Sequence, residues 1–290
     1  MRVLVTGGSG FLGRHTIPEL VRLGHSVAAL ARSAAAAKVV EGLGAIPVLG
    51  DLDQPESLPN VFVSANAEAL VNIASLGFGH GPSIVDAAER AGIARTIFVS
   101  TTSVQTKLET PSKLIRLAAE DAIVASAAEW TIVRPTMIYG APGDRNIERL
   151  LRLLARTPVI PIPGSGDGLQ QPVHVQDLAQ ALAEVLAAEG SIRRRFDLAG
   201  PQAITFRDLV TTAKAAVGSR SLIVHVPLRP ILRAMQAYER RAETPRLKVE
   251  QLLRLTEDKA FSIHQARQVW GYDPRPFSVG VAQEARALWN

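Results

Sequence analysis

The sequence contains no cysteine among its 290 residues. Disulfides, thiolate nucleophiles and zinc sites with cysteine ligands are therefore excluded, and the chain is compatible with a reducing compartment. No grouping of histidine, aspartate and glutamate has the spacing of a metal site, and no Gly-x-Ser-x-Gly elbow is present. We expect a protein without a bound metal.

Long apolar runs are missing as well. The opening segment 1–6 is apolar for too few residues to form the core of a signal peptide. No stretch approaches the roughly 18 apolar residues of a membrane-spanning helix. We therefore expect a cytoplasmic protein with no membrane span.

Clustered positive charge is scarce, although the net charge is +5. The densest basic run is the arginine triplet 193–195. The aromatic residues, 5% of the chain, are not interleaved with basic residues as stacking platforms for nucleic acid would be. A solvated basic face, or attraction of small ligands that carry phosphate, accounts for the surplus, and we expect no nucleic-acid partner.

Short apolar runs alternate regularly with longer helical stretches. Runs that lack a polar side are typical of strands covered on both faces. Their alternation with helices predicts a parallel sheet with right-handed crossovers, which is a doubly wound α/β architecture. The expected strands are 3–5, 26–31, 45–49, 69–73, 96–100 and 130–133, and the expected helices between them include 12–23, 83–91 and 111–127.

The alternation loosens after Pro135, where short proline-rich pieces follow. A chain of 290 residues is long for one compact domain and short for two full ones. We therefore expect a first domain over residues 1–138 and a smaller lobe over 139–290, with a segment at about 171–200 returning to the main sheet. A helix over 206–217, a strand over 222–226 and a mostly helical C-terminal stretch are expected in the lobe.

A glycine-rich loop joins the first strand to the first helix. Its residues are Thr6-Gly7-Gly8-Ser9-Gly10-Phe11-Leu12-Gly13. Gly7 permits the tight turn, Gly10 lets the backbone approach a diphosphate, and Gly13 allows close packing of the helix. Because the N-terminus of that helix attracts anions, the loop predicts dinucleotide binding. The alternative interpretation is a glycine-rich turn without a ligand.

Arg32 and Ser33 follow the second strand. A cofactor with a free ribose 2′-hydroxyl usually meets an acidic residue at this position. Arginine instead makes bidentate contacts with a 2′-phosphate, and Ser33 adds a hydroxyl. We therefore expect NADP(H) rather than NAD(H), the alternative being an exposed arginine at a strand end.

Two further strand ends are expected to line the same ligand. Asp51 and Leu52 follow the third strand. Asp51 either accepts a hydrogen bond from the adenine amino group or caps a helix that begins near Pro55. Ile73 and Ala74 close the fourth strand and are expected on the other side of the cofactor.

Four more segments agree in order and spacing with the glycine loop: Gly50-Asp51-Leu52, Phe98-Val99-Ser100-Thr101-Thr102-Ser103, Arg134-Pro135-Thr136-Met137-Ile138-Tyr139-Gly140 and Val173-His174-Val175-Gln176-Asp177-Leu178-Ala179. Together they resemble the extended and atypical short-chain dehydrogenase/reductases, in particular the NAD-dependent epimerase/dehydratase group and the NmrA-like members. The resemblance implies a seven-stranded Rossmann sheet, a small C-terminal lobe for a small-molecule substrate, and a nicotinamide end near Pro135. It also implies a homodimer formed through the helix expected over 111–127.

The catalytic set of these enzymes is incomplete in this sequence. The resemblance implies a Ser or Thr hydroxyl, a Tyr phenol and a Lys four residues after it, the Lys lowering the pKa of the phenol. Thr102 matches the hydroxyl, but the positions of Tyr and Lys fall near Ser112 and Arg116. In a slightly different register Lys113 lies at the site, where it would polarise a carbonyl or orient the ribose; the alternative is an exposed first-turn lysine.

Tyr139 follows the sixth strand, where it either relays a proton or forms part of the pocket wall. His174 and Asp177 stand where the chain returns toward the first domain. We interpret His174 as a strand histidine with satisfied polar groups, and Asp177 as the cap of a helix beginning at Leu178.

These features favour an NADP(H)-dependent oxidoreductase of altered mechanism, acting on a small molecule that the sequence does not identify. A sugar-nucleotide epimerase or dehydratase is one alternative, although it needs the missing base more strictly than a reductase whose acceptor takes protons from water. The other alternative is a regulator or assembly factor that binds NADP(H) and does no chemistry.

Overall fold

The computed structural model describes residues 1–108, 110–140, 143–241 and 257–289. The chain divides into two compact units: unit 1 comprises residues 1–135, 175–198 and 263–273, and unit 2 comprises 136–174, 199–262 and 274–290. The sequence predicts the first boundary after residue 138 and one returning segment at about 171–200. A second returning segment, 263–273, has no counterpart in that expectation.

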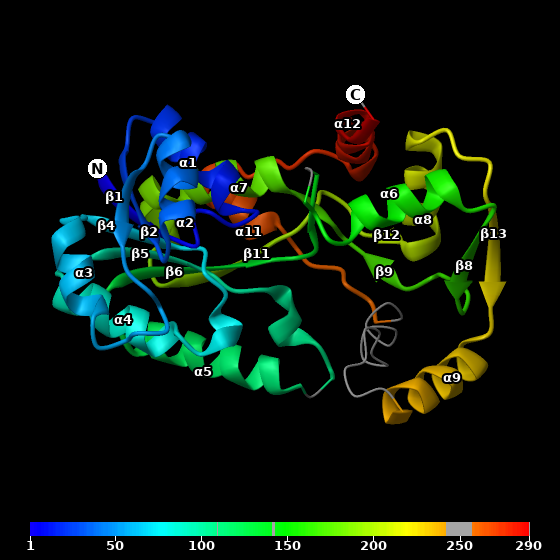
Figure 1. Cartoon of the computed structure of the whole chain (residues 1–290), viewed down its shortest axis with the longest axis horizontal. Helices are drawn as coiled ribbons and strands as arrows, with labels where there is room; N and C mark the ends of the chain where they lie inside the picture. Colours follow the sequence, from blue (N-terminus) through cyan, green and yellow to red (C-terminus); the bar gives the residue numbers. More distant parts are fainter. Residues whose placement is uncertain (109, 141–142, 242–256, 290) are drawn as a thin grey trace. The chain divides into compact units, whose positions relative to one another are not determined.

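Unit 1 is built on a sheet of seven strands in the order β11-β6-β5-β4-β1-β2-β3, and every neighbouring pair is parallel (Figure 1). The order runs outward from β1 in both directions, so the crossover helices cover both faces. This confirms the doubly wound α/β architecture and the Rossmann topology. The strands are β1 (Arg2–Thr6), β2 (Ser26–Ala31), β3 (Ile46–Leu49), β4 (Ala69–Asn72), β5 (Arg95–Val99), β6 (Glu129–Pro135) and β11 (Arg194–Leu198).

Two layers of helices flank this sheet (Figure 1). One layer holds α1 (Gly13–Arg22), α2 (Ala34–Gly42) and α7 (Val175–Glu184), and the other holds α3 (Leu58–Ala65), α4 (Gly81–Arg90) and α5 (Pro111–Ala125). Helix α11 (His264–Trp270) packs against β11. Thr110 caps α5, its hydroxyl oxygen accepting from the Lys113 N–H at 3.3 Å, and Pro111 begins the helix.

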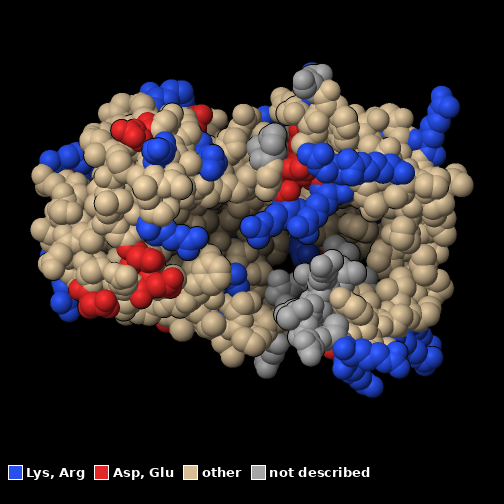
Figure 2. Space-filling model, viewed as in Figure 1, with Lys and Arg blue, Asp and Glu red and all other residues tan. Residues whose placement is uncertain are grey.

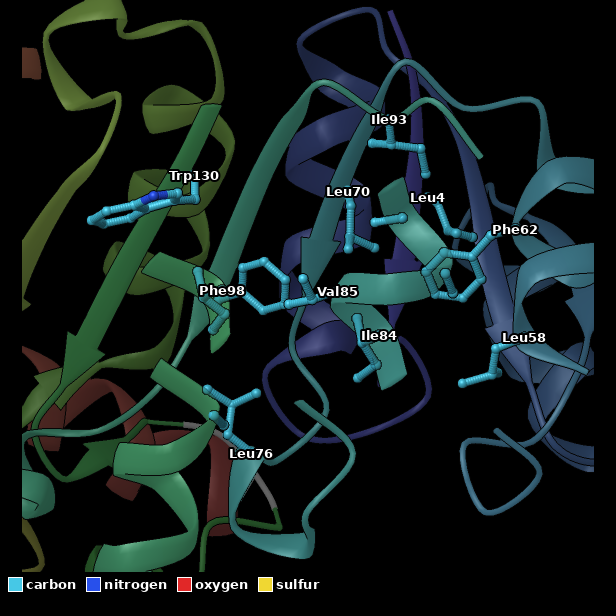
Figure 3. Close-up of a cluster of buried hydrophobic side chains, with 14 of the residues drawn as sticks. Leu4, Leu58, Phe62, Leu70, Leu76, Ile84, Val85, Ile93, Phe98 and Trp130 are labelled. Atoms are coloured by element: carbon cyan, nitrogen blue, oxygen red, sulfur yellow. The ribbon is translucent and has the colours of Figure 1, made fainter. Parts of the chain in front are cut away.

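The core between the sheet and α3, α4 and α5 is formed by side chains on one face of neighbouring strands (Figure 3). Leu4, Leu70 and Phe98 come from β1, β4 and β5 and are 0%, 0% and 2% exposed. They pack in one cluster with Phe62 of α3 and Ile84 of α4. Burial of each of these side chains stabilises the fold by about 1.5–3 kcal/mol. The packed core therefore fixes the positions of the strand ends that carry the predicted site.

A buried arginine fastens the end of α7 to the sheet. Arg95 of β5 is 8% exposed, and its guanidinium has five N–H donors. All five are used at 2.6 to 3.2 Å, by the acceptors Glu129 O, Thr131 Oγ1, Val185 O, Leu186 O and Ser191 Oγ. Burial lowers the pKa of Arg95 to about 10, so the side chain remains a cation that caps two carbonyl groups of the 3₁₀ turn following α7.

Unit 2 combines short strand pairs with helices. Strands β7 and β10 are parallel, as are β8 and β13, whereas β9 and β12 are antiparallel. The described elements are β7 (Ile138–Tyr139), α6 (Ile147–Arg156), β8 (Val159–Pro163), β9 (Leu169–Gln170), β10 (Val173–His174), β12 (Ile204–Thr205), α8 (Phe206–Ala216), β13 (Leu222–Val226), α9 (Leu228–Arg241) and α12 (Phe277–Trp289). Residues 242–256, part of the stretch expected to be helical, lie outside the described residues.

Helix α6 of unit 2 has no counterpart among the helices that the sequence predicts. Its buried residues Ile147, Leu151 and Leu154 recur at i, i+4 and i+7, which is the spacing of an amphipathic helix. They pack in a cluster with Ile160 of β8 and Leu209 of α8. Within the described residues, no helix combines the length and apolarity that a membrane crossing requires.

Candidate dinucleotide-binding site

The glycine loop after β1 leaves no room for side chains at the positions that the sequence singles out. Gly7 has a φ of +69°, and a Cβ there would lie 2.7 Å from Ala74 N. A Cβ on Gly10 would lie 3.2 Å from Gly7 O, and one on Gly13 would overlap the carbonyl oxygens of Gly7 and Gly8. The loop is therefore closed by direct backbone contact, including a 3.0 Å hydrogen bond from Gly10 N to Gly7 O.

The backbone N–H groups just before α1 are available to a ligand. No hydrogen bond within the described part of the chain uses the N–H of Phe11 or Leu12, and the first turn carries no acidic residue. Nε of Arg14 donates to the carbonyl of Ser9 at 2.9 Å and so holds the loop against the helix. Backbone N–H groups and the positive end of the helix dipole are the features that bind a diphosphate. The residues present fit that group.

A buried polar pair aligns the ends of β1 and β4. The Thr6 hydroxyl donates to Asn72 Oδ1 at 2.5 Å, and Asn72 Nδ2 donates to Ala74 O at 3.1 Å. The Ile73 N–H donates to Thr6 O at 3.1 Å. Because Ile73 and Ala74 are fixed by these bonds beside Gly7, the two predicted cofactor-lining residues and the glycine loop form one surface.

Arg32 and Ser33 occupy the end of β2 and the start of α2. The Ser33 hydroxyl oxygen accepts from the Ala36 N–H at 3.2 Å and caps α2, which leaves its proton available to a ligand. Arg32 is exposed and forms no hydrogen bond or ion pair with the described residues. Because no such bond has to be broken, little free energy is needed to turn the Arg32 side chain toward an anion.

Asp51 and Leu52 follow β3. One of the two roles considered for Asp51, the cap of a helix near Pro55, is wrong, because α3 begins at Leu58. Asp51 Oδ1 instead accepts from the Asp53 N–H at 3.1 Å and stabilises the turn after the strand. Leu52 packs against the core cluster below the sheet. The adenine contact of Asp51 stays a prediction.

Thr102 and Lys113 both lie beside the segment that follows β5. Thr102 begins a 3₁₀ turn, is 7% exposed, and its hydroxyl donates to Pro135 O at 3.3 Å. Lys113 Nζ donates to Thr106 O at 2.7 Å, just beyond that turn. The Lys113 ammonium group is thus hydrogen-bonded to the backbone carbonyl of Thr106. The Thr102 hydroxyl links the carboxyl ends of β5 and β6.

Arg116 lies one turn further along α5. Its Nη1 donates to Ser112 O at 3.0 Å, and its guanidinium covers Gly77 so closely that a Cβ there would lie 2.7 Å from Nη2. Gly77 follows β4, so Arg116 reaches the carboxyl edge of the sheet. Ser112 and Arg116 stand where the resemblance implies Tyr and Lys. This side of α5 therefore carries a permanent cation, the Arg116 guanidinium, and no phenol.

A buried charge network below Thr102 was not indicated by the sequence. Glu120 of α5 is 1% exposed and accepts from Ser100 Oγ at 2.6 Å and from the Arg134 guanidinium in a two-pronged ion pair. On β11, Asp197 accepts from Gln105 Nε2 at 2.8 and 2.9 Å. Burial raises the pKa of Asp197, and the Gln105 bond opposes that rise. These bonds position the 3₁₀ turn that carries Thr102.

Within unit 2, Tyr139 is fully buried. Its ring meets that of His174 edge to face at a centroid distance of 5.3 Å, and its hydroxyl lies 3.5 Å from Phe277 O. His174 is a buried residue of β10, so its predicted place in a strand is confirmed. The prediction that its polar groups are satisfied is wrong for Nε2, which is buried and has no hydrogen bond within the described residues. In unit 1, the predicted cap role of Asp177 is wrong, because α7 begins at Val175 and Asp177 lies inside its first turn. The acid still meets the positive end of the helix dipole there.

Unit 2 also contains two neighbouring buried carboxyl groups. Asp144, 5% exposed, accepts from the N–H groups of Asn146, Ile147 and Glu148 at 2.5, 3.1 and 3.2 Å and so caps α6. Glu284 of α12 is 0% exposed, and neither of its oxygens has a well-aligned hydrogen bond within the described residues. Burial, and then the charge of Asp144, raises the pKa of Glu284 to about 9. Glu284 is therefore a neutral acid at pH 7.

Comparison with known proteins agrees with this geometry. Residues 7–189 match the model of a family described as NAD(P)H-binding. The chain is 27% identical to the ceramide reductase of Caulobacter vibrioides, covering 97% of this chain and 88% of that protein. It is 28% identical to the 2-alkyl-3-oxoalkanoate reductase of Stenotrophomonas maltophilia, covering 99% of this chain and 98% of that protein.

The fold also has solved counterparts. The UDP-glucose 4-epimerase of Thermotoga maritima, determined with UDP-glucose, superposes with a TM-score of 0.76 at 16% identity, covering 99% of this chain and 98% of that one. At this identity the likeness concerns the fold alone, and it agrees with the expected Rossmann architecture. With the glycine loop and the family match on the same residues, the chain belongs to the NAD(P)H-binding family.

Proposed function

We propose that this protein is an NADP(H)-dependent reductase of carbonyl compounds that carry long apolar chains. The observation that carries the proposal is the exposed Arg32 guanidinium directly after β2, without an acid at that strand end. The names of two relatives, ceramide reductase and 2-alkyl-3-oxoalkanoate reductase, support reduction as the reaction. The second name denotes a 3-oxo acid bearing an alkyl chain, and it supports an aliphatic ketone as the substrate class.

The preference for NADP(H) follows from charge. A 2′-phosphate offers Arg32 a bidentate, charge-assisted contact, whereas the 2′-hydroxyl of NAD(H) offers a guanidinium no anion. Hydrogen bonds to charged groups contribute about 1.5–3 kcal/mol, and 1.4 kcal/mol corresponds to a tenfold change in affinity. We therefore expect NADPH to bind at least about tenfold more tightly than NADH.

Bound NADPH supplies the hydride that the carbonyl carbon accepts. The task of the chain is then to hold the carbonyl oxygen and to stabilise the negative charge that grows on it. The Thr102 hydroxyl, just after β5, is the donor we assign to that oxygen; to donate there it has to turn away from Pro135 O, to which it donates at 3.3 Å in the described structure. Ser112 and Arg116 stand where the resemblance implies Tyr and Lys. We therefore propose that a water molecule donates the proton that converts the oxyanion to the alcohol.

A substrate panel tests this assignment. NADPH oxidation is followed with matched long-chain and short-chain 3-oxo esters, a quinone, an aldehyde and a nucleotide sugar. We expect turnover of the long-chain 3-oxo ester to exceed that of its short-chain partner. Thr102→Ala should lower kcat by roughly a hundredfold, within the range of hydrogen-bond and acid-base contributions. Conversion of the nucleotide sugar alone would overturn the proposal.

One observation favours a second candidate function, binding of NADP(H) without chemistry. Helix α5 presents Ser112 and Arg116, and neither side chain deprotonates near neutral pH to relay a proton. A regulator or assembly factor would need only the cofactor loop. If NADPH binds but no compound in the panel oxidises it, while a partner protein co-purifies, this second function replaces the first.

A further inference from the structure

The ladder of β8 and β13 in unit 2 has one buried face and one exposed face. Ile160 on the inner face is 3% exposed. On the outer face, the parallel register pairs Val159 with Leu222 and Pro161 with Val224. Val159, Leu222 and Val224 are 45%, 66% and 43% exposed, and Pro161 is exposed as well. Paired residues of parallel strands point to the same side, so these four form a continuous apolar patch.

The helix that follows this ladder is amphipathic and shallowly packed. Helix α9 begins at Leu228, two residues after β13 ends, and none of its side chains is buried. Leu228, Ile231, Leu232 and Met235 recur at i, i+3, i+4 and i+7, and all four are half-buried. They form an apolar stripe that the described residues cover only in part.

The same helix carries a row of positive charge. Arg229, Arg233 and Arg240 recur at i, i+4 and i+11, so they project from one side of α9, and all three are exposed. Arg241 adds a fourth arginine, against one acid, Glu239. Figure 2 shows basic side chains gathered where Figure 1 draws α9, next to uncharged surface where it draws β8 and β13. The apolar ladder is thus followed, two residues after β13, by a helix that carries exposed cations.

We propose that the face formed by β8, β13 and α9 binds the surface of an anionic lipid membrane. A helix with an apolar stripe and an arginine row lies in the plane of lipid headgroups, its apolar side dipping toward the acyl chains and its cations meeting phosphate. The paired aliphatic side chains of the ladder extend the apolar contact. This is binding to a membrane surface, for which no helix has to cross the bilayer.

Charge and composition favour lipid over other partners. A protein partner is typically recognised through aromatic anchors in pockets, whereas the exposed ladder face is made of Val, Leu and Pro. Single-stranded nucleic acid would require stacking side chains beside the arginines, and Tyr238 is the aromatic residue that α9 provides. An anionic membrane offers phosphate groups to the arginines of α9 and acyl chains to the apolar side chains of the ladder. The proposal does not depend on the proposed reductase activity, since its readout is lipid binding.

Vesicle co-sedimentation of the full chain tests the proposal. The protein is mixed with vesicles of phosphatidylcholine alone or of phosphatidylcholine with phosphatidylglycerol, at low and high salt. We expect binding to the anionic vesicles to exceed binding to the zwitterionic ones at least tenfold and to weaken as salt screens the charges. Equal binding to both vesicles, or tighter binding of an oligonucleotide or polyglutamate than of the anionic vesicles, would overturn the proposal.

A matched pair of variants locates the surface. The test variant changes Arg229, Arg233, Arg240 and Arg241 to Gln; the control changes four exposed arginines of unit 2 outside α9 to Gln, namely Arg145, Arg149, Arg156 and Arg220. Each juxtamembrane arginine contributes about fivefold to binding, so the test variant should lose at least about a hundredfold. The control should lose less than about tenfold. Equal losses in both would show attraction by net charge alone and would refute the assignment to α9.

A third variant tests the apolar half. Leu222→Ser with Val224→Ser alters only exposed side chains, so folding, checked by circular dichroism, should be retained. Binding to anionic vesicles should fall mainly at high salt, where the arginines are screened and apolar contact dominates. An unchanged partition at high salt would exclude the ladder from the surface.

Discussion

Glu284 should make the stability of the protein depend on pH in a direction unusual for a carboxylate. Its folded-state pKa is raised from 4.5 to about 9, first by burial and then by Asp144. A raised pKa means that the folded protein keeps a proton that the unfolded chain releases. The stability from this group is therefore fully present below pH 4.5 and is lost as the pH rises toward about 9.

The size of the effect follows from the shift. Each pKa unit corresponds to about 1.36 kcal/mol, so at pH 8 the buried proton costs the folded state roughly 4 to 5 kcal/mol relative to acidic solution. That is a large part of the roughly 5–15 kcal/mol by which proteins are stable. Glu284→Gln keeps the shape and removes the titration. The variant should therefore be close to the wild type in stability near pH 5 and several kcal/mol more stable near pH 8.

Urea unfolding at a series of pH values, followed by circular dichroism, measures this difference. Glu41→Gln is the matched control, because it removes an exposed carboxyl group in α2, and its curve should run parallel to the wild type. If the wild type and Glu284→Gln keep a constant stability difference from pH 5 to pH 9, Glu284 is ionised in the folded protein and the reasoning fails.

Three further changes test the fold and the site. Arg95→Lys leaves buried carbonyl groups of the 3₁₀ turn after α7 without donors, and thermal unfolding should show a loss of about 2–4 kcal/mol, whereas an unchanged melting temperature would contradict the role of the guanidinium. Gly13→Ala should abolish NADPH binding in calorimetry while circular dichroism stays close to the wild type, because its Cβ would overlap the Gly7 and Gly8 carbonyls; retained affinity would show that the loop does not hold the cofactor. Tyr139→Phe should leave turnover unchanged, since the buried phenol meets Phe277 O, and a large drop in kcat would assign it a proton relay.

Features that depend on neighbours in sequence could be predicted. The strands of unit 1 are short apolar runs, and the glycine loop lies between a strand and a helix, so local pattern alone indicates a doubly wound fold and a dinucleotide site. Asp51 and Asp177 show the limit of this approach. Both acids stand near helix starts, but a shift of a few residues in the helix boundary moved them out of the cap position.

Features that depend on distant partners could not be predicted. Glu120 looks like an ordinary helix acid until the fold brings Ser100 and Arg134 to it across 20 and 14 residues. Arg95 looks like an exposed strand-start residue, yet its acceptors lie up to 96 residues away. Glu284 has no sequence signal at all for its burial beside Asp144. Charged residues are normally assigned to the surface, so each of these needs the tertiary structure.

Calorimetric titration of the protein and of Arg32→Ala with NADPH and NADH tests the central claim, that α1 and its glycine loop hold a dinucleotide which Arg32 identifies by its 2′-phosphate. We predict that the wild type binds NADPH at least about tenfold more tightly than NADH. Arg32→Ala should bind both with the weaker, NADH-like affinity. Absence of heat with either dinucleotide, or a preference for NADPH that survives Arg32→Ala, would contradict the account.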